Sequence, residues 1–258
     1  MANSSPLPGR HVIDLSGKVA LITGGSRGLG RAIALAYAEA GADIVVASRK
    51  LDACQAVAAE IAALGRQALP VAANVSRWDG CDALIDAAYD RFGRVDILVN
   101  NAGKSPLYES LTSIDERLYD AVLDLNLKGP FRLSAVIGER MAAGAGGSIV
   151  NISSLAAIRP QKHVVTYAAA KAGLNAMTEA LADALGPKVR VNCIMPGPFL
   201  TDVSKAWDAA AFQARADALI AMKRGGAPEE IVGAALYLAS DHASFTTAAI
   251  IRVDGGCR

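Results

Sequence analysis

Cysteine and histidine are scarce in this chain of 258 residues, and neither residue type forms a cluster. None of the four cysteines belongs to a Cys-x-x-Cys motif, and the three histidines are far apart along the chain: Cys54, Cys81, Cys193, Cys257, His11, His163 and His242. Scattered cysteines in a chain of this size indicate reduced thiols, as in a cytoplasmic protein. The same scatter predicts no metal site.

An excess of either charge is also missing. The chain has 26 Lys and Arg against 25 Asp and Glu, a formal net charge of +1. So weak a field favours neither nucleic acid nor an anionic membrane surface as a partner. No apolar run approaches the roughly 18 residues that suggest a membrane span. Residues 1–12 lack the apolar stretch of a secretory signal, so we expect a flexible lead-in there.

Apolar residues, in contrast, are abundant at 52%, which is enough to build a large core. Short apolar runs alternate with stretches of helical periodicity. Strands are predicted at 18–23, 43–48, 67–73, 95–100, 147–153, 188–194 and 249–254, and helices at 29–40, 51–64, 79–92, 114–142, 166–186 and 229–240. This alternation predicts an α/β fold, a Rossmann-type doubly wound parallel sheet of about seven strands with helices on both faces. No linker divides residues 13–258, which we interpret as a single dinucleotide-binding catalytic domain.

One segment, about 198–228, interrupts this alternation. Connections this long in a compact domain are usually lids or binding loops. Its helical pieces carry Trp207, Phe212 and Met222, which indicates either ordinary packing or a substrate flap.

The first predicted strand runs directly into the sequence TGGSRGLG at 23–30, and a helix follows. Glycines at Gly24, Gly28 and Gly30 permit tight turns, and a helix N-terminus offers free N–H groups to a diphosphate. In this position the pattern predicts a dinucleotide site rather than a plain strand-to-helix turn.

Recognition of the adenosine ribose is expected at the end of the second strand, where an acidic residue would bind a free 2′-hydroxyl. This chain has Ser48 there, followed by Arg49 and Lys50, and Arg27 lies in the glycine loop. Arginine binds a 2′-phosphate in a bidentate manner, so the sequence favours NADP(H) over NAD(H). The alternative is that Arg49 and Lys50 are solvated residues at a helix start.

Tyr167 and Lys171 have the i, i+4 spacing that places two side chains on one helix face. A lysine ammonium beside a phenol would lower the pKa of the phenol and prepare it for proton transfer near neutral pH. Ser154 follows the fifth predicted strand, at the sheet edge where ligands gather. Taken alone, a Tyr-x-x-x-Lys pattern is common by chance.

Together these motifs make the chain resemble a short-chain dehydrogenase/reductase of about 250 residues. The matching pieces occur in the family's order: TGGSRGLG (23–30), NNAG (100–103), DLNLKGP with Asn126, NISS with Ser154, YAAAK (167–171), PGPFLT (196–201) and VDGG (253–256). The general resemblance is to 3-oxoacyl-carrier-protein reductases and to sugar or polyol dehydrogenases.

The resemblance implies a role for each matching residue. Tyr167 would be the general acid/base, Lys171 would lower its pKa and hold the nicotinamide ribose, and Ser154 rather than Ser153 would orient the substrate oxygen. Asn126 would hold a water of a proton relay, although a buried helical Asn can also bond its own backbone. The implied cofactor-binding residues are Gly24, Ser26, Arg27, Gly28, Leu29, Gly30, Ser48, Arg49, Asn74, Val75, Asn101, Ala102, Gly103, Tyr167, Lys171, Pro196, Gly197, Phe199 and Thr201.

We therefore expect an NADP(H)-dependent oxidoreductase that transfers hydride between nicotinamide and a carbonyl or secondary alcohol. The alternatives are an NAD-linked sugar or polyol dehydrogenase and a catalytically inactive NADP-binding sensor or scaffold. The expected substrate pocket is lined by the flap after Pro198 and by Lys104, Ser105, Pro106, residues 155–157, His163 and Val164. GAGG at 144–147 lacks the basic residue expected for an acyl carrier protein, which disfavours that partner. The resemblance further implies a cytoplasmic homotetramer, or dimer.

Overall fold

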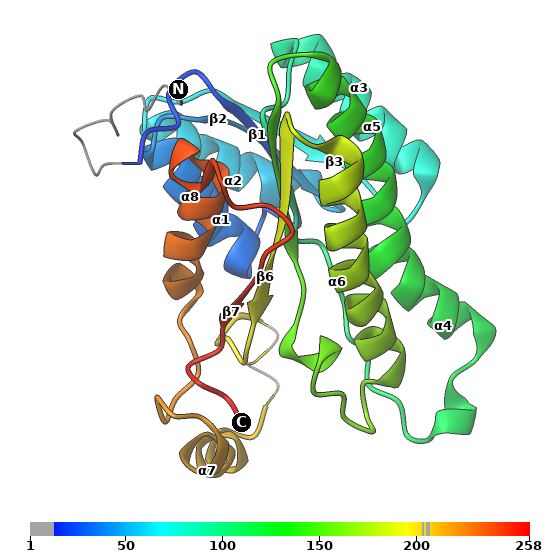
Figure 1. Ribbon diagram of the computed structural model, residues 1–258. Coiled ribbons are helices and arrows are strands. Elements are labelled where there is room, and N and C mark those ends of the chain that lie inside the picture. Colours follow the sequence, from blue (N-terminus) through cyan, green and yellow to red (C-terminus); the bar gives the residue numbers. More distant parts are fainter. Residues whose placement is uncertain (1–12, 203, 205–206) are drawn as a thin grey trace, which may run out of the picture.

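A seven-stranded parallel sheet forms the centre of the molecule (Figure 1). The computed structural model describes residues 13–202, 204 and 207–258, so the lead-in expected at 1–12 lies outside the described residues. The strand order is β3-β2-β1-β4-β5-β6-β7, with every neighbouring pair parallel. The strands are β1 (Val19–Thr23), β2 (Asp43–Ser48), β3 (Ala68–Ala72), β4 (Ile97–Asn100), β5 (Gly147–Ile152), β6 (Val189–Pro196) and β7 (Ile250–Val253). The predicted Rossmann-type fold is confirmed.

Helices cover both faces of the sheet, which explains why the strands are apolar throughout. Along β1, Ala20 and Ile22 join one core cluster, while Val19 and Leu21 join the other. One face is covered by α1 (Gly28–Glu39), α2 (Leu51–Ala63) and α8 (Val232–Ala239), and the other by α3 (Trp78–Phe92), α5 (Gly129–Ala143) and α6 (Val165–Leu185). Short 3-10 turns span Leu111–Ser113, Leu155–Ala157, Pro228–Ile231 and Asp241–Ala243.

The order of the strands determines where a ligand can bind. Strand β1 pairs with β2 on one side and with β4 on the other. The chain adds β2 and β3 on one side of β1 and then adds β4 to β7 on the other side, so the strand order switches direction between β1 and β4. Ligands of open α/β sheets bind outside the carboxyl ends of the strands at such a point. In this protein that edge carries the glycine loop after β1 and the NNAG segment after β4.

The helix predicted over 114–142 is divided into three pieces. Helix α4 (Glu116–Leu123) is followed by one π-helical turn (Asp124–Lys128), and α5 then begins at Gly129. A Cβ at Gly129 would lie only 1.9 Å from the carbonyl oxygen of Val75, so the chain passes very close to a neighbouring backbone. Single π-turns inside helices often occur at functional sites, and this one contains Asn126.

The long segment after β6 contains one regular helix, α7 (Ala209–Leu219), which packs against the end of the chain. Ile220 forms an antiparallel bridge with Cys257, and the Arg258 N–H donates to the Leu219 carbonyl at 2.8 Å. Figure 1 shows α7 beside the C-terminus, at the end of the molecule toward which β6 points. Both therefore lie near the edge where a ligand is expected.

Candidate active site

The glycine loop allows a ligand to approach its backbone closely. Gly24 and Gly28 have φ angles of +64° and +53°, which residues with a Cβ rarely adopt. A Cβ at Gly30 would lie 2.3 Å from the Gly24 carbonyl oxygen, so α1 packs directly against the loop. The side chain of Arg27 makes no capping hydrogen bond with α1. The first N–H groups of α1 are therefore available to an anionic diphosphate.

Asn101 ties the glycine loop to the end of β4. Its Nδ2 donates to the carbonyl oxygens of Thr23 at 2.9 Å and Gly24 at 3.1 Å. The Thr23 hydroxyl accepts hydrogen bonds from the backbone N–H groups of Asn101 and Ala102 at 3.0 and 3.1 Å. These bonds fix the position of the glycine loop relative to the end of β4.

Two arginines stand beside the end of β2 without an acidic partner. The guanidinium groups of Arg27 and Arg49 make no hydrogen bond or ion pair with any described residue. Ser48 lies 3.1 Å from the sulfur of Cys54, and the residue at the end of β2 carries no charge. This set of donors fits a 2′-phosphate of an adenosine ribose, because the residues at the end of β2, Ser48 to Lys50, include no carboxylate.

Asn74, after β3, has one half of its amide already engaged. Its Oδ1 accepts from the Ser76 hydroxyl at 2.8 Å and from the Ser76 N–H at 3.3 Å. The Nδ2 group remains available as a donor beside the buried Val75. An amide at this place can therefore donate to an adenine ring but has little capacity left to accept.

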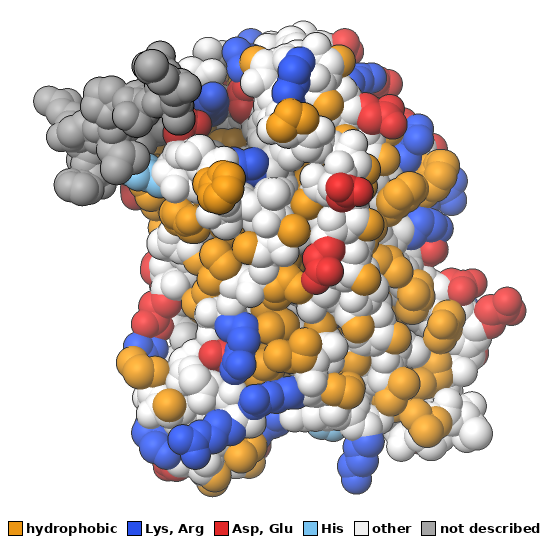
Figure 2. Space-filling view, in the orientation of Figure 1, with side chains coloured by type: hydrophobic (Ala, Val, Ile, Leu, Met, Phe, Trp, Pro, Cys, Tyr) orange, Lys and Arg blue, Asp and Glu red, His pale blue; other side chains and the backbone are white. Residues whose placement is uncertain are grey.

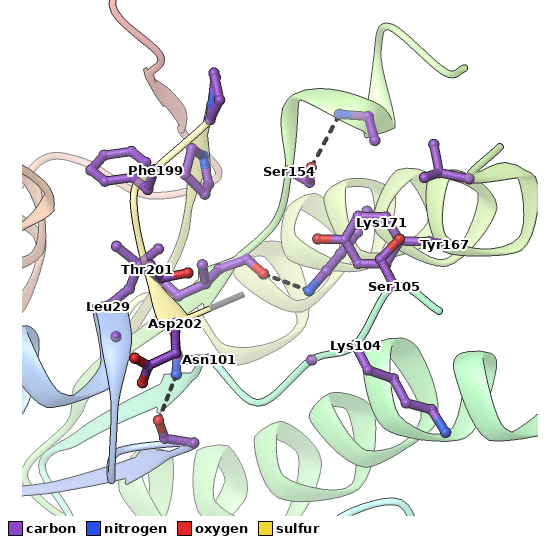
Figure 3. A pocket seen from close by; sticks show the side chains of 18 of the residues that line it. Leu29, Asn101, Lys104, Ser105, Ser154, Tyr167, Lys171, Phe199, Thr201 and Asp202 are labelled. Atoms are coloured by element: carbon purple, nitrogen blue, oxygen red, sulfur yellow. Dashed lines mark hydrogen bonds between the residues drawn. The ribbon is translucent and has the colours of Figure 1, made fainter. Parts of the chain in front are cut away.

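Tyr167 and Lys171 lie on the same face of α6, and Ser154 faces them from the turn after β5 (Figure 3). The Ser154 hydroxyl accepts from the Ala156 N–H at 3.2 Å, which fixes the side chain at the start of the 3-10 turn. Ser153 points elsewhere: its hydroxyl donates to the Lys171 carbonyl at 3.3 Å and the residue is buried. Both serines border the cavity, but it is the side chain of Ser154 that forms a hydrogen bond with Tyr167.

Lys171 is held inside the protein by a single strong contact. Its side chain is buried, and Nζ donates to the Ile152 carbonyl at 2.7 Å (Figure 3). Burial lowers the pKa of Lys171 to about 8, because the charged form loses its hydration. Nζ is 5.8 Å from the centre of the Tyr167 ring.

The pKa of Tyr167 is raised above its ordinary value, whereas the sequence led us to expect a lowered one. Burial is the main cause, since the phenolate would lose hydration, and a hydrogen bond with Ser154 opposes it. The Lys171 ammonium is directed at the Ile152 carbonyl instead of the phenol. In this structure, therefore, Tyr167 is a protonated donor at neutral pH.

Asn126 lies in the π-turn and is fully buried. Its Nδ2 donates to the carbonyl oxygens of Val122 and Lys104, each at 2.9 Å, so the side chain does bond its own helix. Its Oδ1 has no partner among the described residues. A Cβ at Gly103 would lie 2.8 Å from this oxygen and 3.7 Å from Lys171 Nζ. Gly103 thus leaves a small space between an unpaired acceptor and the lysine.

These groups surround one cavity of about 1460 Å³. Gly30 and Asn126 lie behind its wall, and all other predicted site residues line it: Gly24, Ser26, Arg27, Gly28, Leu29, Ser48, Arg49, Asn74, Val75, Asn101, Ala102, Gly103, Ser154, Tyr167, Lys171, Pro196, Gly197, Phe199 and Thr201. The cavity is large enough for a dinucleotide and a small substrate together.

The far end of the cavity contains residues that sequence reasoning missed. Ser105, His163 and Val164 line it as expected, but Pro106 does not, and Lys104 points away from Tyr167 (Figure 3). The residues missed altogether are Leu107, Arg159, Gln161, Cys257 and Arg258, whereas Asp208, Arg215, Leu219 and Ile220 belong to the segment 198–228 that was expected as a substrate flap. The helical spacing of 208, 212, 215 and 219 could have indicated one face of a helix, but nothing local indicated what that face covers.

Within the described ranges 13–202, 204 and 207–258, no helix has the length and hydropathy that crossing a bilayer requires. In the same part of the chain, no group of three His, Cys, Asp or Glu side chains is placed to hold a metal ion.

Residues 24–258 match a family model described as enoyl-(acyl carrier protein) reductase. A 3-oxoacyl-[acyl-carrier-protein] reductase of Synechocystis is 38% identical over 247 residues, which is 94% of this chain and 97% of that protein. A solved 7α-hydroxysteroid dehydrogenase complexed with NADH and 7-oxo glycochenodeoxycholic acid has a TM-score of 0.91 at 35% identity and covers 95% and 98% of the two chains. An L-sorbose reductase of Gluconobacter frateurii complexed with NADPH and L-sorbose has a TM-score of 0.89 at 32% identity, with coverage of 95% and 98%.

Proposed function

This chain belongs to the short-chain dehydrogenase/reductase family of NAD(P)(H)-dependent oxidoreductases, and we propose that it uses NADP(H) to interconvert a carbonyl group and a secondary alcohol. The single observation that carries the proposal is the placement of Tyr167, Lys171 and Ser154. They line one wall of a cavity whose other end is built from the glycine loop.

Tyr167 acts as the proton donor in this proposal. When bound, NADPH would supply the hydride for the carbonyl carbon, and the Tyr167 hydroxyl would give its proton to the carbonyl oxygen. Ser154 donates a hydrogen bond to the same oxygen and holds it beside the phenol. Because burial raises the pKa of Tyr167, reduction can proceed from the protonated form at neutral pH. Alcohol oxidation needs the phenolate, so its rate is expected to rise with pH.

Lys171 and Asn126 have supporting roles in the same proposal. With a pKa of about 8, Lys171 can exchange a proton close to neutral pH. The unpaired Oδ1 of Asn126 faces the space beside Lys171 and suits a water molecule that returns a proton from solvent. Lys171 would also hold the ribose hydroxyls of the nicotinamide half of the cofactor.

Preference for NADP(H) rests on Arg27 and Arg49. Both guanidinium groups lack a partner among the described residues, and both line the cavity at the end of β2. A carboxylate at Ser48 would instead favour NAD(H). The alternative of an NAD-linked sugar or polyol dehydrogenase predicts tighter binding of NADH. A homotetramer or dimer, located in the cytoplasm, completes the proposal.

The test is a pair of fluorescence titrations with NADPH and NADH on the wild-type protein and on Arg49→Asp. We expect NADPH to bind at least about tenfold more tightly to the wild type, and the variant to lose this preference, because a carboxylate repels the 2′-phosphate. Arg117→Asp makes the same change of charge on exposed α4, outside the cavity, and should leave the preference unaltered. Tighter NADH binding by the wild type would support the alternative cofactor.

Turnover separates an enzyme from an inactive NADP-binding scaffold. Tyr167→Phe removes the proton donor while keeping the ring, so we expect NADPH binding to be retained and ketone reduction to fall by about 100-fold or more. Equal turnover by the wild type and Tyr167→Phe would contradict the assigned role.

A further inference from the structure

The cavity is much more basic than the chain as a whole. The chain has 26 Lys and Arg against 25 Asp and Glu. The described residues that line the cavity include eight Lys or Arg and two Asp: Arg27, Arg49, Lys50, Lys104, Arg159, Lys171, Arg215, Arg258, Asp202 and Asp208. A cleft lined by one sign of charge concentrates the field and attracts ligands of opposite charge.

Five of these basic residues already have an explanation. Arg27, Arg49 and Lys50 stand where the adenosine phosphates are expected, Lys171 belongs to the catalytic group, and Lys104 points away from Tyr167 (Figure 3). Three remain, Arg159, Arg215 and Arg258, and none of them is part of the cofactor site. We call these three the substrate-end arginines.

Arg159 lies one turn beyond the catalytic serine. Its N–H donates to the Leu155 carbonyl at 2.9 Å, so the backbone curls around the segment that starts at Ser154. One nitrogen of the guanidinium, Nη1, donates to the Cys257 carbonyl at 2.8 Å. Arg159 therefore fixes the end of the chain close to the catalytic residues and keeps other donors for a ligand.

Arg215 reaches the cavity from α7. The residues of this helix that line the cavity include Phe212, Arg215 and Leu219, whose spacings of three and four place them on one face. Arg258 meets this face from the end of the chain, since its N–H bonds the Leu219 carbonyl at 2.8 Å. Figure 2 shows Lys and Arg side chains gathered around α7 and the C-terminus.

The substrate-end arginines are not neutralised by ion pairs. Among the described residues, the side chains of Arg215 and Arg258 have no hydrogen bond or salt bridge, and Arg159 bonds only a carbonyl. Asp208, the N-cap residue of α7, accepts from the Ala211 N–H at 2.7 Å, and Asp217 within the helix accepts from Gln213 Nε2 at 2.9 Å. Among the described residues that line this end of the cavity, the three arginines stand against one acidic side chain, Asp208, so this end keeps a net positive character.

Apolar residues line the part of the cavity that contains Arg215 and Arg258. Ala216, Ile220 and Cys257 are buried together, with Leu155 and Phe212 packed against them. The rings of Trp207 and Phe212 are 5.1 Å apart and tilted by 31°. An apolar carbon chain with an anionic far end therefore suits a ligand that reaches from Tyr167 to Arg215 and Arg258.

We infer that the substrate is a ketone, or the matching secondary alcohol, that carries a carboxylate at the end remote from the reacting carbon. This inference rests on the proposed function and specifies its substrate class. Arg215 and Arg258 bind the carboxylate through charge-assisted hydrogen bonds, which guanidinium groups form in a bidentate manner. The apolar wall holds the carbon chain, which places the carbonyl oxygen between Ser154 and Tyr167.

The test compares straight-chain oxoalkanoates of increasing length with their methyl esters, which have nearly the same shape but no charge. With NADPH as reductant, we expect kcat/KM for the acid of matching length to exceed that of its ester by about tenfold or more. Arg215→Gln and Arg258→Gln should each raise KM for the acid by about tenfold and change kcat little. Neither variant should affect the ester.

Arg117→Gln serves as the control, because it removes one positive charge from α4, outside the cavity. Equal kcat/KM for acid and ester at every length, or a preference that persists in both variants, would overturn the inference while leaving the proposed function intact. If no ketone is reduced, the proposed function fails, and the inference is then decided by calorimetry of the binding of saturated alkanoates to the protein. Alkanoate binding that weakens in Arg215→Gln supports a carboxylate site at the arginines. Absence of alkanoate binding, or binding that is unchanged in Arg215→Gln, refutes it.

Discussion

The side chain of Lys171 is buried, and its ammonium group donates a hydrogen bond to one backbone carbonyl. Its pKa falls from 10.5 to about 8 through loss of hydration. Between these pH values the unfolded chain keeps a proton that the folded protein has released. The unfolded state thus binds more protons, and the stability supplied by this residue must rise with pH across that window.

Lys171→Met should remove this pH dependence. We expect the free energy of unfolding of the wild type to increase relative to the variant between pH 8 and 10, by up to about 1.4 kcal/mol per pH unit. Denaturant unfolding of the cofactor-free proteins at several pH values measures the difference. A constant difference across this range would show that Lys171 keeps its proton in the folded protein.

At this scale, the sequence predicted individual residues at the cofactor end of the cavity, whereas at the substrate end it predicted Ser105, His163 and a flap but none of the three arginines. The glycine loop and Tyr167–Lys171 are recognisable because their chemistry depends on neighbours within eight residues of sequence. Arg159, Arg215 and Arg258 meet only through the fold, by way of the Cys257 and Leu219 carbonyls. The predicted direction of the Tyr167 pKa shift was also wrong. The shift depends on the burial of the phenol and on the orientation of the Lys171 ammonium, which are both set by tertiary structure.

Among the elements, the π-turn between α4 and α5 was not predictable from periodicity. Apolar spacing continues through it, so the sequence suggested one helix, whereas the close passage of Gly129 beside Val75 at the end of the turn arises only in the fold. The strands were predictable because both faces of the sheet are covered, which makes each strand a continuous apolar run. Helix α7 was recognised only as a helical piece of a long segment, since its exposed sides weaken the pattern.

A matched pair of glycine substitutions tests the close passage at the π-turn. Gly129→Ala places a methyl group 1.9 Å from the Val75 oxygen, so we expect a loss of about 1–3 kcal/mol or more in the free energy of unfolding. At Gly233 in α8, a Cβ would meet nothing within 4 Å, so Gly233→Ala should gain about 0.5–1 kcal/mol from helix propensity. Chemical denaturation of both variants gives the comparison. Equal changes in the free energy of unfolding for the two variants would mean that the junction between the π-turn and α5 shifts to make room for the methyl group.

For the whole molecule, one apolar surface stands apart from the cavity. A hollow of about 500 Å³ is lined by Leu123, Asp124, Leu127, Lys128, Phe131, Gly173 and Met177, from α4, the π-turn, α5 and α6. Phe131 is 43% exposed beside it, although it is a large aromatic residue. Apolar surface of this kind suits contact with another subunit. The expected homotetramer or dimer would bury it.

Analytical ultracentrifugation of the wild type, Phe131→Glu and Leu64→Glu tests this assembly. Leu64, at the end of α2, is also 43% exposed but lies outside the hollow, so it controls for the introduction of a charge at an apolar surface position. We expect a tetrameric or dimeric mass for the wild type and for Leu64→Glu, and a shift toward smaller species in Phe131→Glu, because a buried unpaired carboxylate opposes association. A monomeric wild type would refute the assembly altogether, whereas an unshifted Phe131→Glu oligomer would place the subunit contact on another face.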